Sequence, residues 1–231
     1  MKPHSYSSIF KRYQSESPVS TELRRVYHNM KKSPDGKHPK TFMLTSPTRG
    51  EGKSTVASYL AVTIAQFPKK RVLLIDADLR RPRQHRIFDV GNEVGLKDCL
   101  ESDLDPIKAC QQTELANLQV MTAGSHAKEP GRLFESEALA EVINKVAFYN
   151  DIVLVDTAPV LAVSDTLFFC PVIDSVLLLV LAGVTPREVV TRAKNVLVDS
   201  GATIGGVLLN NASQVLPYYY DSKYYGYSGG S

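Results

Sequence analysis

Cysteine is scarce in this chain of 231 residues, and the thiols that occur are widely spaced. The three cysteines, Cys99, Cys110 and Cys170, form no C-x-x-C pair. Their spacing argues against both a disulfide framework and a zinc site, and it is typical of a protein in a reducing compartment.

Long apolar runs are also missing. The strongest run, Val176–Ala182, has the length of a β-strand, whereas a membrane-spanning helix needs about 20 apolar residues. The chain does not open with the pattern of a signal peptide. We therefore expect a cytoplasmic protein that reaches a membrane only through a partner or a surface.

Neither sign of charge is in large excess. The net charge of +3 is too small to predict a nucleic-acid partner, and we expect none. Hydrophobic residues make up 43% and charged residues 22%, which is ordinary for a soluble globular protein. The length fits one α/β domain with its own core, and we find no internal repeat.

The most informative stretch is a glycine-bearing loop between a short apolar run and a helical pattern, in Thr41–Val56. Glycine lets a phosphate approach the main chain, and a helix N-terminus adds N–H groups and positive potential. The pattern differs from G-x-x-x-x-G-K-[ST] only at Pro47. We interpret it as a nucleotide site, in preference to a Gly-Lys-Ser turn without function. The expected nucleotide-binding residues of the loop are Thr48, Arg49, Gly50, Glu51, Gly52, Lys53, Ser54 and Thr55.

Carboxylates follow two further apolar runs, at the points where strands should end. The run Val72–Ile75 leads into Asp76 and Asp78, and Asp151–Val155 leads into Asp156. Ligands of doubly wound sheets bind beyond the carboxyl ends of the strands, so all three acids should face the phosphate loop. Helix capping is the alternative role for the first two, but their position favours metal and proton chemistry. The expected Mg²⁺ ligands are Ser54, Asp76 and Asp156.

The remaining patterns alternate between strand and helix, which predicts a doubly wound, mostly parallel α/β sheet flanked by helices. Further strands are expected at 118–122, 174–182 and 204–211, and helices around 20–30, 139–146 and 189–197. Residues 1–20 are interpreted as a loose arm, with Ser20 or Thr21 capping the helix that follows. Asn210, at the end of the last strand, either reads a purine edge or caps a turn.

The C-terminal end of the chain is rich in tyrosine. Its segment cannot bury its rings against itself, and small polar residues keep it mobile. It is either a sticky aromatic tail that docks on a partner or a set of phenols offered as phosphoryl acceptors. Each phosphorylation would add roughly −1.5 to −2 charges. The tyrosines are Tyr218, Tyr219, Tyr220, Tyr224, Tyr225 and Tyr227.

Four features together resemble the bacterial tyrosine kinases of the capsule and exopolysaccharide type. They are the loop Ser46–Thr55, the I-D-A-D-L-R signature at Ile75–Arg80, the V-L-V-D-T-A-P signature at Val153–Pro159 and the tyrosine-rich end. The likeness covers nearly the whole chain, from about residue 20 onward. The tail discriminates most, because the septum- and chromosome-positioning ATPases share the three other motifs.

This resemblance implies an ATP-dependent protein-tyrosine autokinase with the fold of a P-loop NTPase and with ATP and Mg²⁺ as cofactors. The three motifs then correspond to the Walker A, Walker A′ and Walker B elements of the family. The catalytic residues that the resemblance implies are Lys53, Asp76, Asp78 and Arg80. The tail tyrosines would accept phosphate in trans within an oligomer. The implied division of the chain is an N-terminal arm and oligomerisation helix at 1–40, a kinase domain at 41–214 and a tail at 215–231.

The resemblance also implies partners. The family carries an E-x-x-R-x-x-R helix that packs subunits into a ring; here Glu22 and Arg25 match, and His28 replaces the last arginine. Members without membrane spans work with a membrane adaptor of the chain-length-determining type, which would hold this protein at the inner face of the membrane, and with a tyrosine phosphatase. The alternative is a positioning ATPase without kinase activity, whose K-G-G-x-G-K loop has Thr48 and Arg49 in this chain instead of its first Lys and Gly.

Overall fold

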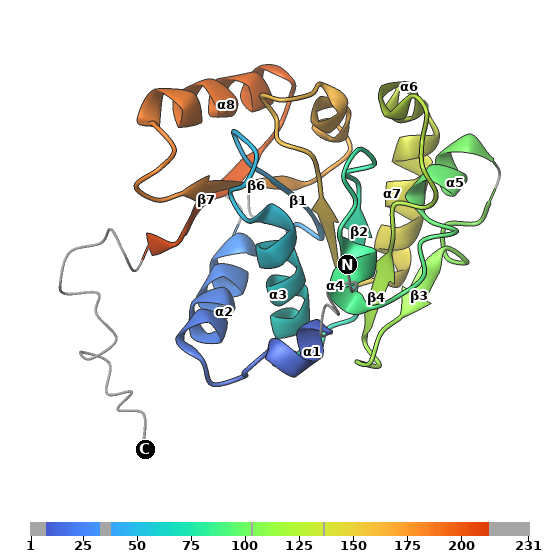
Figure 1. Cartoon of the computed structure of the whole chain (residues 1–231), viewed down its shortest axis with the longest axis horizontal. Coiled ribbons are helices and arrows are strands. Elements are labelled where there is room, and N and C mark those ends of the chain that lie inside the picture. The colour runs from blue at the N-terminus through green and yellow to red at the C-terminus, as the bar shows by residue number, and fades with distance from the viewer. Residues whose placement is uncertain (1–7, 33–37, 103, 136, 213–231) are drawn as a thin grey trace, which may run out of the picture.

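A seven-stranded sheet forms the middle layer of the structure, a computed structural model that describes residues 8–32, 38–102, 104–135 and 137–212 (Figure 1). The strand order is β3-β4-β2-β5-β1-β6-β7, and every pairing except that of β3 with β4 is parallel. The mostly parallel sheet confirms the predicted fold class. The strands are β1 (Thr41–Thr45), β2 (Val72–Asp76), β3 (Cys110–Gln112), β4 (Leu118–Met121), β5 (Ile152–Asp156), β6 (Ser175–Leu181) and β7 (Ile204–Asn210).

The antiparallel edge strand β3 is the one strand that the sequence did not indicate. It has only three residues, Cys110, Gln111 and Gln112, and these are half-buried or exposed. A segment this short shows neither alternation nor an apolar run, so periodicity gives no signal for it. Its position at the sheet edge does not affect the strands that carry the motifs.

Helices cover both faces of the sheet. One apolar cluster joins β1 and β2 to α1, α2, α3 and α4, and another joins the opposite face to α5 through α8 and the 3₁₀ helix η1. The helices are α1 (Ile9–Arg12), α2 (Pro18–Met30), α3 (Lys53–Gln66), α4 (Gln84–Phe88), α5 (Leu96–Glu101), α6 (Pro130–Phe134), α7 (Ala138–Tyr149), η1 (Asp165–Phe169) and α8 (Arg187–Asp199). Within the described ranges, no helix is long and apolar enough to cross a bilayer.

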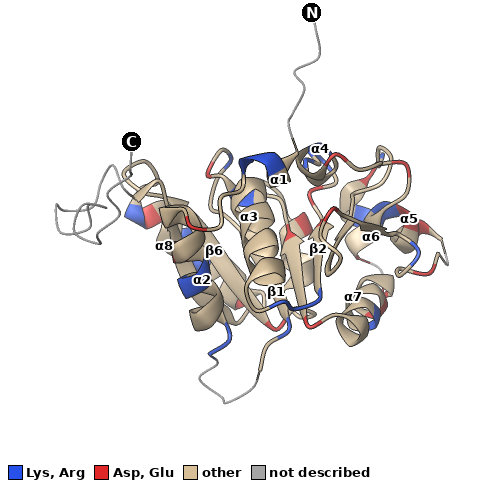
Figure 2. Ribbon diagram, turned by 90° about the horizontal axis from the view of Figure 1, so that it is seen from below, with Lys and Arg blue, Asp and Glu red and all other residues tan. Residues whose placement is uncertain are grey.

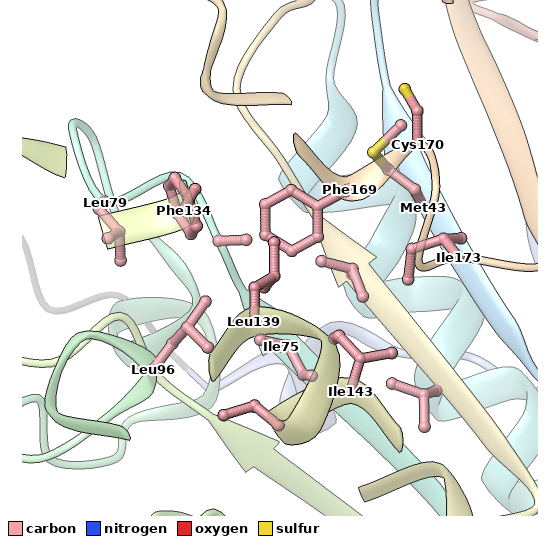
Figure 3. Close-up of a cluster of buried hydrophobic side chains, with 14 of the residues drawn as sticks. Met43, Ile75, Leu79, Leu96, Phe134, Leu139, Ile143, Phe169, Cys170 and Ile173 are labelled. Atoms are coloured by element: carbon pink, nitrogen blue, oxygen red, sulfur yellow. The ribbon is translucent and has the colours of Figure 1, made fainter. Parts of the chain in front are cut away.

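The core on the α7 face is centred on Phe169 of η1, which Figure 3 shows between Phe134 and Met43. The rings of Phe134 and Phe169 lie 5.0 Å apart between centroids, and Phe169 is fully buried. Tilted pairs at this distance add to the stabilisation that burial alone gives. This packing fixes η1, and with it Asp165, beside the carboxyl ends of the central strands.

The N-terminal region differs from the expected loose arm. From Ser8 onward the chain packs on the domain: Ile9 in α1 is 3% exposed, and the Tyr13 hydroxyl lies 3.0 Å from that of Thr63 in α3. The cap of α2 is Ser17, whose hydroxyl accepts a hydrogen bond from the Ser20 amide, so the predicted caps were wrong. Pro18 at the first helical position explains the earlier start.

Candidate active site

The three motifs of the sequence lie at the carboxyl ends of three adjacent strands, β1, β5 and β2. β5 lies between β2 and β1, and Asp76 pairs in register with Asp156, which has Leu44 on its other side. The phosphate loop begins directly after β1 and leads into α3 at Lys53. The structure therefore brings Asp76 and Asp156 to the same edge as the loop, as the parallel arrangement predicted.

The phosphate loop is braced from within by Glu51, whose side chain is buried. One carboxylate oxygen accepts hydrogen bonds from the Thr48 amide at 2.9 Å and the Thr48 hydroxyl at 2.7 Å. The other accepts the Leu181 amide at 3.0 Å, which ties the loop to the end of β6. The carboxylate of Glu51 thus holds the loop in shape, and both of its oxygens are occupied by protein donors.

Asn210, at the end of β7, also holds the loop. Its side-chain amide donates to the Glu51 carbonyl at 2.8 Å, while its oxygen accepts the Asn211 amide at 2.9 Å. Gly52 lies against this amide with φ +93°, and a Cβ there would come within 2.4 Å of the Asn210 nitrogen. The backbone conformation at Gly52 therefore favours glycine, and a larger residue would also displace the Asn210 amide from the loop. A role of Asn210 in reading a purine stays a prediction.

Asp76 and Asp156 are fully buried carboxyl groups. Burial raises the pKa of Asp156 to about 6, although the Ser54 hydroxyl, the Gln84 amide and the Lys53 charge oppose the shift. Burial also raises the pKa of Asp76 well above its ordinary value, and the nearby Asp156 adds to the rise. Two buried acids side by side are costly in the absence of a cation, which is typical of a site built to bind one.

Gln84, the first residue of α4, joins the two acids, and the sequence analysis did not single it out. Its main-chain N–H donates to Asp76 at 2.8 Å, and its side-chain amide donates to Asp156 at 2.8 Å. The same amide reaches the Ser54 carbonyl, and its oxygen accepts the Ser58 hydroxyl at 2.7 Å. A lone glutamine four residues past the I-D-A-D-L-R signature gives no sequence signal, because only the fold places it in the core.

The same contacts agree with the alternative role of Asp76 in helix capping, and its role in metal and proton chemistry stays a prediction. One oxygen of Asp76 accepts the amides of Arg83 and Gln84, each at 2.8 Å, at the start of α4. The residue does cap a short helix, yet it also lies beside Asp156 at the mouth of the loop. Asp78 is partly exposed, and one of its oxygens accepts the Arg81 amide at 3.0 Å.

Arg80 makes an ion pair with Asp165, the first residue of η1. Its Nε lies 2.6 Å from one oxygen of Asp165, and its second terminal nitrogen lies 3.1 Å from the other. The partner carboxylate is buried, so this fork-to-fork pair links the loop after β2 to η1. A catalytic role for Arg80 stays a prediction, and its observed contact is with the protein.

The residues present fit a magnesium ion. One oxygen of Asp156 is buried and has no hydrogen-bond partner, and Ser54 lies beside it in the first turn of α3. Within the described ranges, no three His, Cys, Asp or Glu side chains form a metal cage by themselves. Magnesium prefers one or two protein oxygens completed by water and phosphate, which is what this arrangement offers.

The residues predicted for oligomerisation lie on the outer side of α2. Arg25 and Glu22 are exposed and form an ion pair of 2.6 Å, and His28 is exposed on the same helix. The predicted acceptor tyrosines and the boundary at residue 214 lie outside the described residues.

Comparisons with known proteins agree with this geometry, although no protein-family profile matches the chain. Tyrosine-protein kinase YwqD of Bacillus subtilis is 36% identical over 191 residues, covering 83% of this chain and 80% of that protein. Putative tyrosine-protein kinase CapB of Staphylococcus aureus is 29% identical over 228 residues, covering 99% and 98%. The crystal structure of the chimerical protein CapA2B2 superposes with a TM-score of 0.81 at 32% identity, covering 89% and 90%. The chain belongs to the bacterial tyrosine-protein kinase family.

Proposed function

We propose that this protein transfers the γ-phosphoryl group of ATP to tyrosine hydroxyls, first of all those of its own C-terminal segment. The observation that carries the proposal is the buried Asp156 oxygen without a partner, next to Ser54 and Lys53 at the mouth of the phosphate loop. Family membership supports the same activity, since YwqD and CapB are both named tyrosine-protein kinases.

In this proposal the side chains and loop amides of the protein bind and orient the phosphates and the ion, and one carboxylate accepts a proton. The loop amides and Lys53 hold the phosphates, and Ser54 and Asp156 hold the ion directly or through water. Magnesium, when bound, neutralises charge on the β- and γ-phosphates. Asp78 accepts the phenol proton while the tyrosine oxygen forms a bond to the γ-phosphorus and the bond to the β-phosphate oxygen breaks, releasing ADP. Asp76 and Gln84 keep the Asp156 carboxylate in place.

We assign the acceptor role to the six tail tyrosines, which one subunit would present to the site of another in an oligomer. The exposed Glu22, Arg25 and His28 of α2 are the proposed contact between subunits, in a ring whose strength depends on the charge of His28. Several phosphotyrosines on neighbouring tails would repel each other and loosen the assembly. We also propose a membrane adaptor and a tyrosine phosphatase as partners, and capsule or exopolysaccharide synthesis or export as the process regulated.

Mixing two variants tests phosphorylation in trans. One variant carries Lys53→Met with its tail intact, and the other is active but ends at residue 212. Phosphosite mapping after incubation with MgATP should find phosphotyrosine at 218–227 of the Lys53→Met chain, and none when either variant is incubated alone. A mixture without phosphotyrosine, repeated with a peptide from the adaptor's cytosolic tail, would contradict the proposal.

The positioning-ATPase alternative is less supported, because the relatives that match most of this chain are named kinases. It makes a different prediction for the same proteins. A positioning ATPase would hydrolyse ATP at equal rates with and without residues 213–231 and would phosphorylate no tyrosine under any of these conditions.

A further inference from the structure

The amino-terminal edge of the sheet, opposite the candidate active site, has a basic surface that the catalytic proposal does not use. Six basic residues lie on the turns around this edge, and all six are exposed. Figure 2 shows basic segments along the lower side of the molecule, below α2 and around the start of β1. We call this surface the basic edge. Its residues are Lys31, Lys32, Lys40, Lys69, Lys70 and Arg71.

Strand pairing brings these turns together. Lys40 directly precedes β1 and Arg71 directly precedes β2, with β5 between the two strands. The Lys40 carbonyl accepts the Val153 amide at 2.8 Å, and the Arg71 carbonyl accepts the amides of Asp151 and Ile152 at 3.0 and 3.2 Å. Basic residues far apart in the sequence therefore share one side of the molecule.

Two acidic residues that the structure describes at this edge accept hydrogen bonds from the main chain. Asp174 accepts the amides of Lys40 and Thr41 at 2.8 and 2.9 Å. Asp151 accepts the Arg71 amide at 2.9 Å and pairs with its guanidinium at 3.1 Å. In the described part of the chain, no carboxylate lies within ion-pair distance of Lys40 or Lys69. Among the described residues, most of the basic side chains at this edge are thus outside ion pairs.

An exposed aromatic pair adjoins the basic edge. Phe148 and Tyr149, the last two residues of α7, are 78% and 52% exposed and are separated from Asp151 only by Asn150. Their rings lie 5.2 Å apart between centroids in an edge-to-face arrangement. A phenylalanine this exposed adds nothing to the core, whereas aromatic rings beside basic residues are typical of surfaces that enter the headgroup region of a bilayer.

We propose that the basic edge and the Phe148–Tyr149 pair form a docking surface for a bilayer with anionic headgroups. Charge complementarity favours such an occupant, since five of the six basic residues are lysines that act as point charges and the single arginine is paired with Asp151. Docking in this way would turn the candidate active site away from the bilayer. The contact is independent of the proposed kinase activity.

Co-sedimentation of the full chain with vesicles tests this inference. The vesicles are phosphatidylcholine alone or phosphatidylcholine mixed with phosphatidylglycerol. Each basic residue near an anionic surface contributes about fivefold to binding, so Lys40→Glu/Lys69→Glu should weaken binding to the anionic vesicles by at least about 25-fold. The matched control, Arg192→Glu/Lys194→Glu, changes the net charge equally on exposed positions of α8 and should bind like the unmodified protein.

A second variant separates the aromatic contribution from charge. Phe148→Ser/Tyr149→Ser should weaken binding by a factor that stays the same as salt rises, whereas the effect of the lysine variant should shrink with salt. Equal loss in the α8 control, or no preference for anionic vesicles, would overturn the inference. Binding of this edge to an acidic peptide or an oligonucleotide, but not to vesicles, would also overturn it. None of these results depends on whether tyrosine is phosphorylated.

Discussion

The two edges of the sheet use the same residue type in opposite ways. At the amino-terminal edge, Asp151 and Asp174 are bound by main-chain amides of neighbouring strand starts. At the carboxyl-terminal edge, Asp156 is buried with one oxygen lacking a partner, and Asp76 lies beside it. The pKa values follow: hydrogen bonds from Arg71 lower the pKa of Asp151, and burial raises the pKa of Asp156 to about 6.

This difference separates aspartates that stabilise the fold from those that cost stability for the sake of a ligand. A carboxylate that accepts main-chain amides contributes to folding, whereas an incompletely bonded buried one opposes it until a cation arrives. Substitution of an aspartate of the first kind should therefore lower the stability of the fold, and substitution of the second kind should lower activity. Each prediction below tests one side of that comparison.

The largest effect is expected for Asp156→Asn. Loss of a magnesium-binding carboxylate should lower the rate of phosphotyrosine formation by more than about 100-fold. The folded protein without nucleotide should become more stable at pH 7.5, by roughly 1–3 kcal/mol, because a buried carboxylate with a raised pKa opposes folding above that pKa. Urea unfolding and phosphotyrosine assays on the same preparation measure both changes.

The stability gained in Asp156→Asn is expected only over a defined pH range. The cost of the Asp156 carboxylate is present above its folded pKa of about 6 and disappears below the ordinary value of 3.8. The advantage of Asp156→Asn should therefore shrink as the pH falls from 7.5 to about 4. A variant that is less stable than the unmodified protein at pH 7.5 would place Asp156 with the structural aspartates.

The next largest effect is expected for Gln84→Leu. This change removes the amide that donates to Asp156 and the oxygen that accepts the Ser58 hydroxyl. Because residues that orient a metal ligand typically contribute 10- to 100-fold, activity should fall by about that factor. The loss should appear in kcat and in the dependence on Mg²⁺ concentration, with little change in KM for ATP. Gln84→Glu would place a third acid in the pocket and should not restore activity.

Sequence patterns could predict the motif strands because each has an apolar run followed by a functional residue, as in Val72–Ile75 before Asp76. They placed Asp76 and Asp156 correctly, since strand ends in a parallel sheet share an edge. Gln84 and the Arg80–Asp165 pair could not be predicted, because each joins segments that are distant in the sequence. The packed N-terminal residue Ile9 was missed for a similar reason: its short helix has no periodicity of its own.

On the structural side of the comparison, Asp174→Ala should destabilise the fold and spare the chemistry. The change removes the acceptor for the amides of Lys40 and Thr41 at the start of β1. Losing the acceptor for one exposed and one partly buried amide costs roughly 1 kcal/mol, measured as a shift of the urea midpoint at constant m-value. Activity below the unfolding transition should stay within about twofold of the unmodified protein, since Asp174 is at the far edge of the sheet. A large loss of kcat without a stability change would contradict the division between the edges.

The smallest effect is expected for Asp151, and it should appear only in acid. Hydrogen bonds and the charge of Arg71 lower the pKa of this carboxyl, so its contribution to stability is present above the ordinary pKa of 3.8 and is lost as the pH falls through the folded pKa. The side chain is partly exposed, and solvent screening keeps the contribution below about 1 kcal/mol. In urea unfolding, Asp151→Asn should therefore be slightly less stable than the unmodified protein at pH 6, and the difference should vanish once the pH has fallen below the lowered pKa of the folded state. If Asp151→Asn were instead more stable than the unmodified protein at pH 6, with an advantage that shrinks on acidification, Asp151 would behave like Asp156. The contrast between a satisfied and an unsatisfied aspartate would then not explain the two edges.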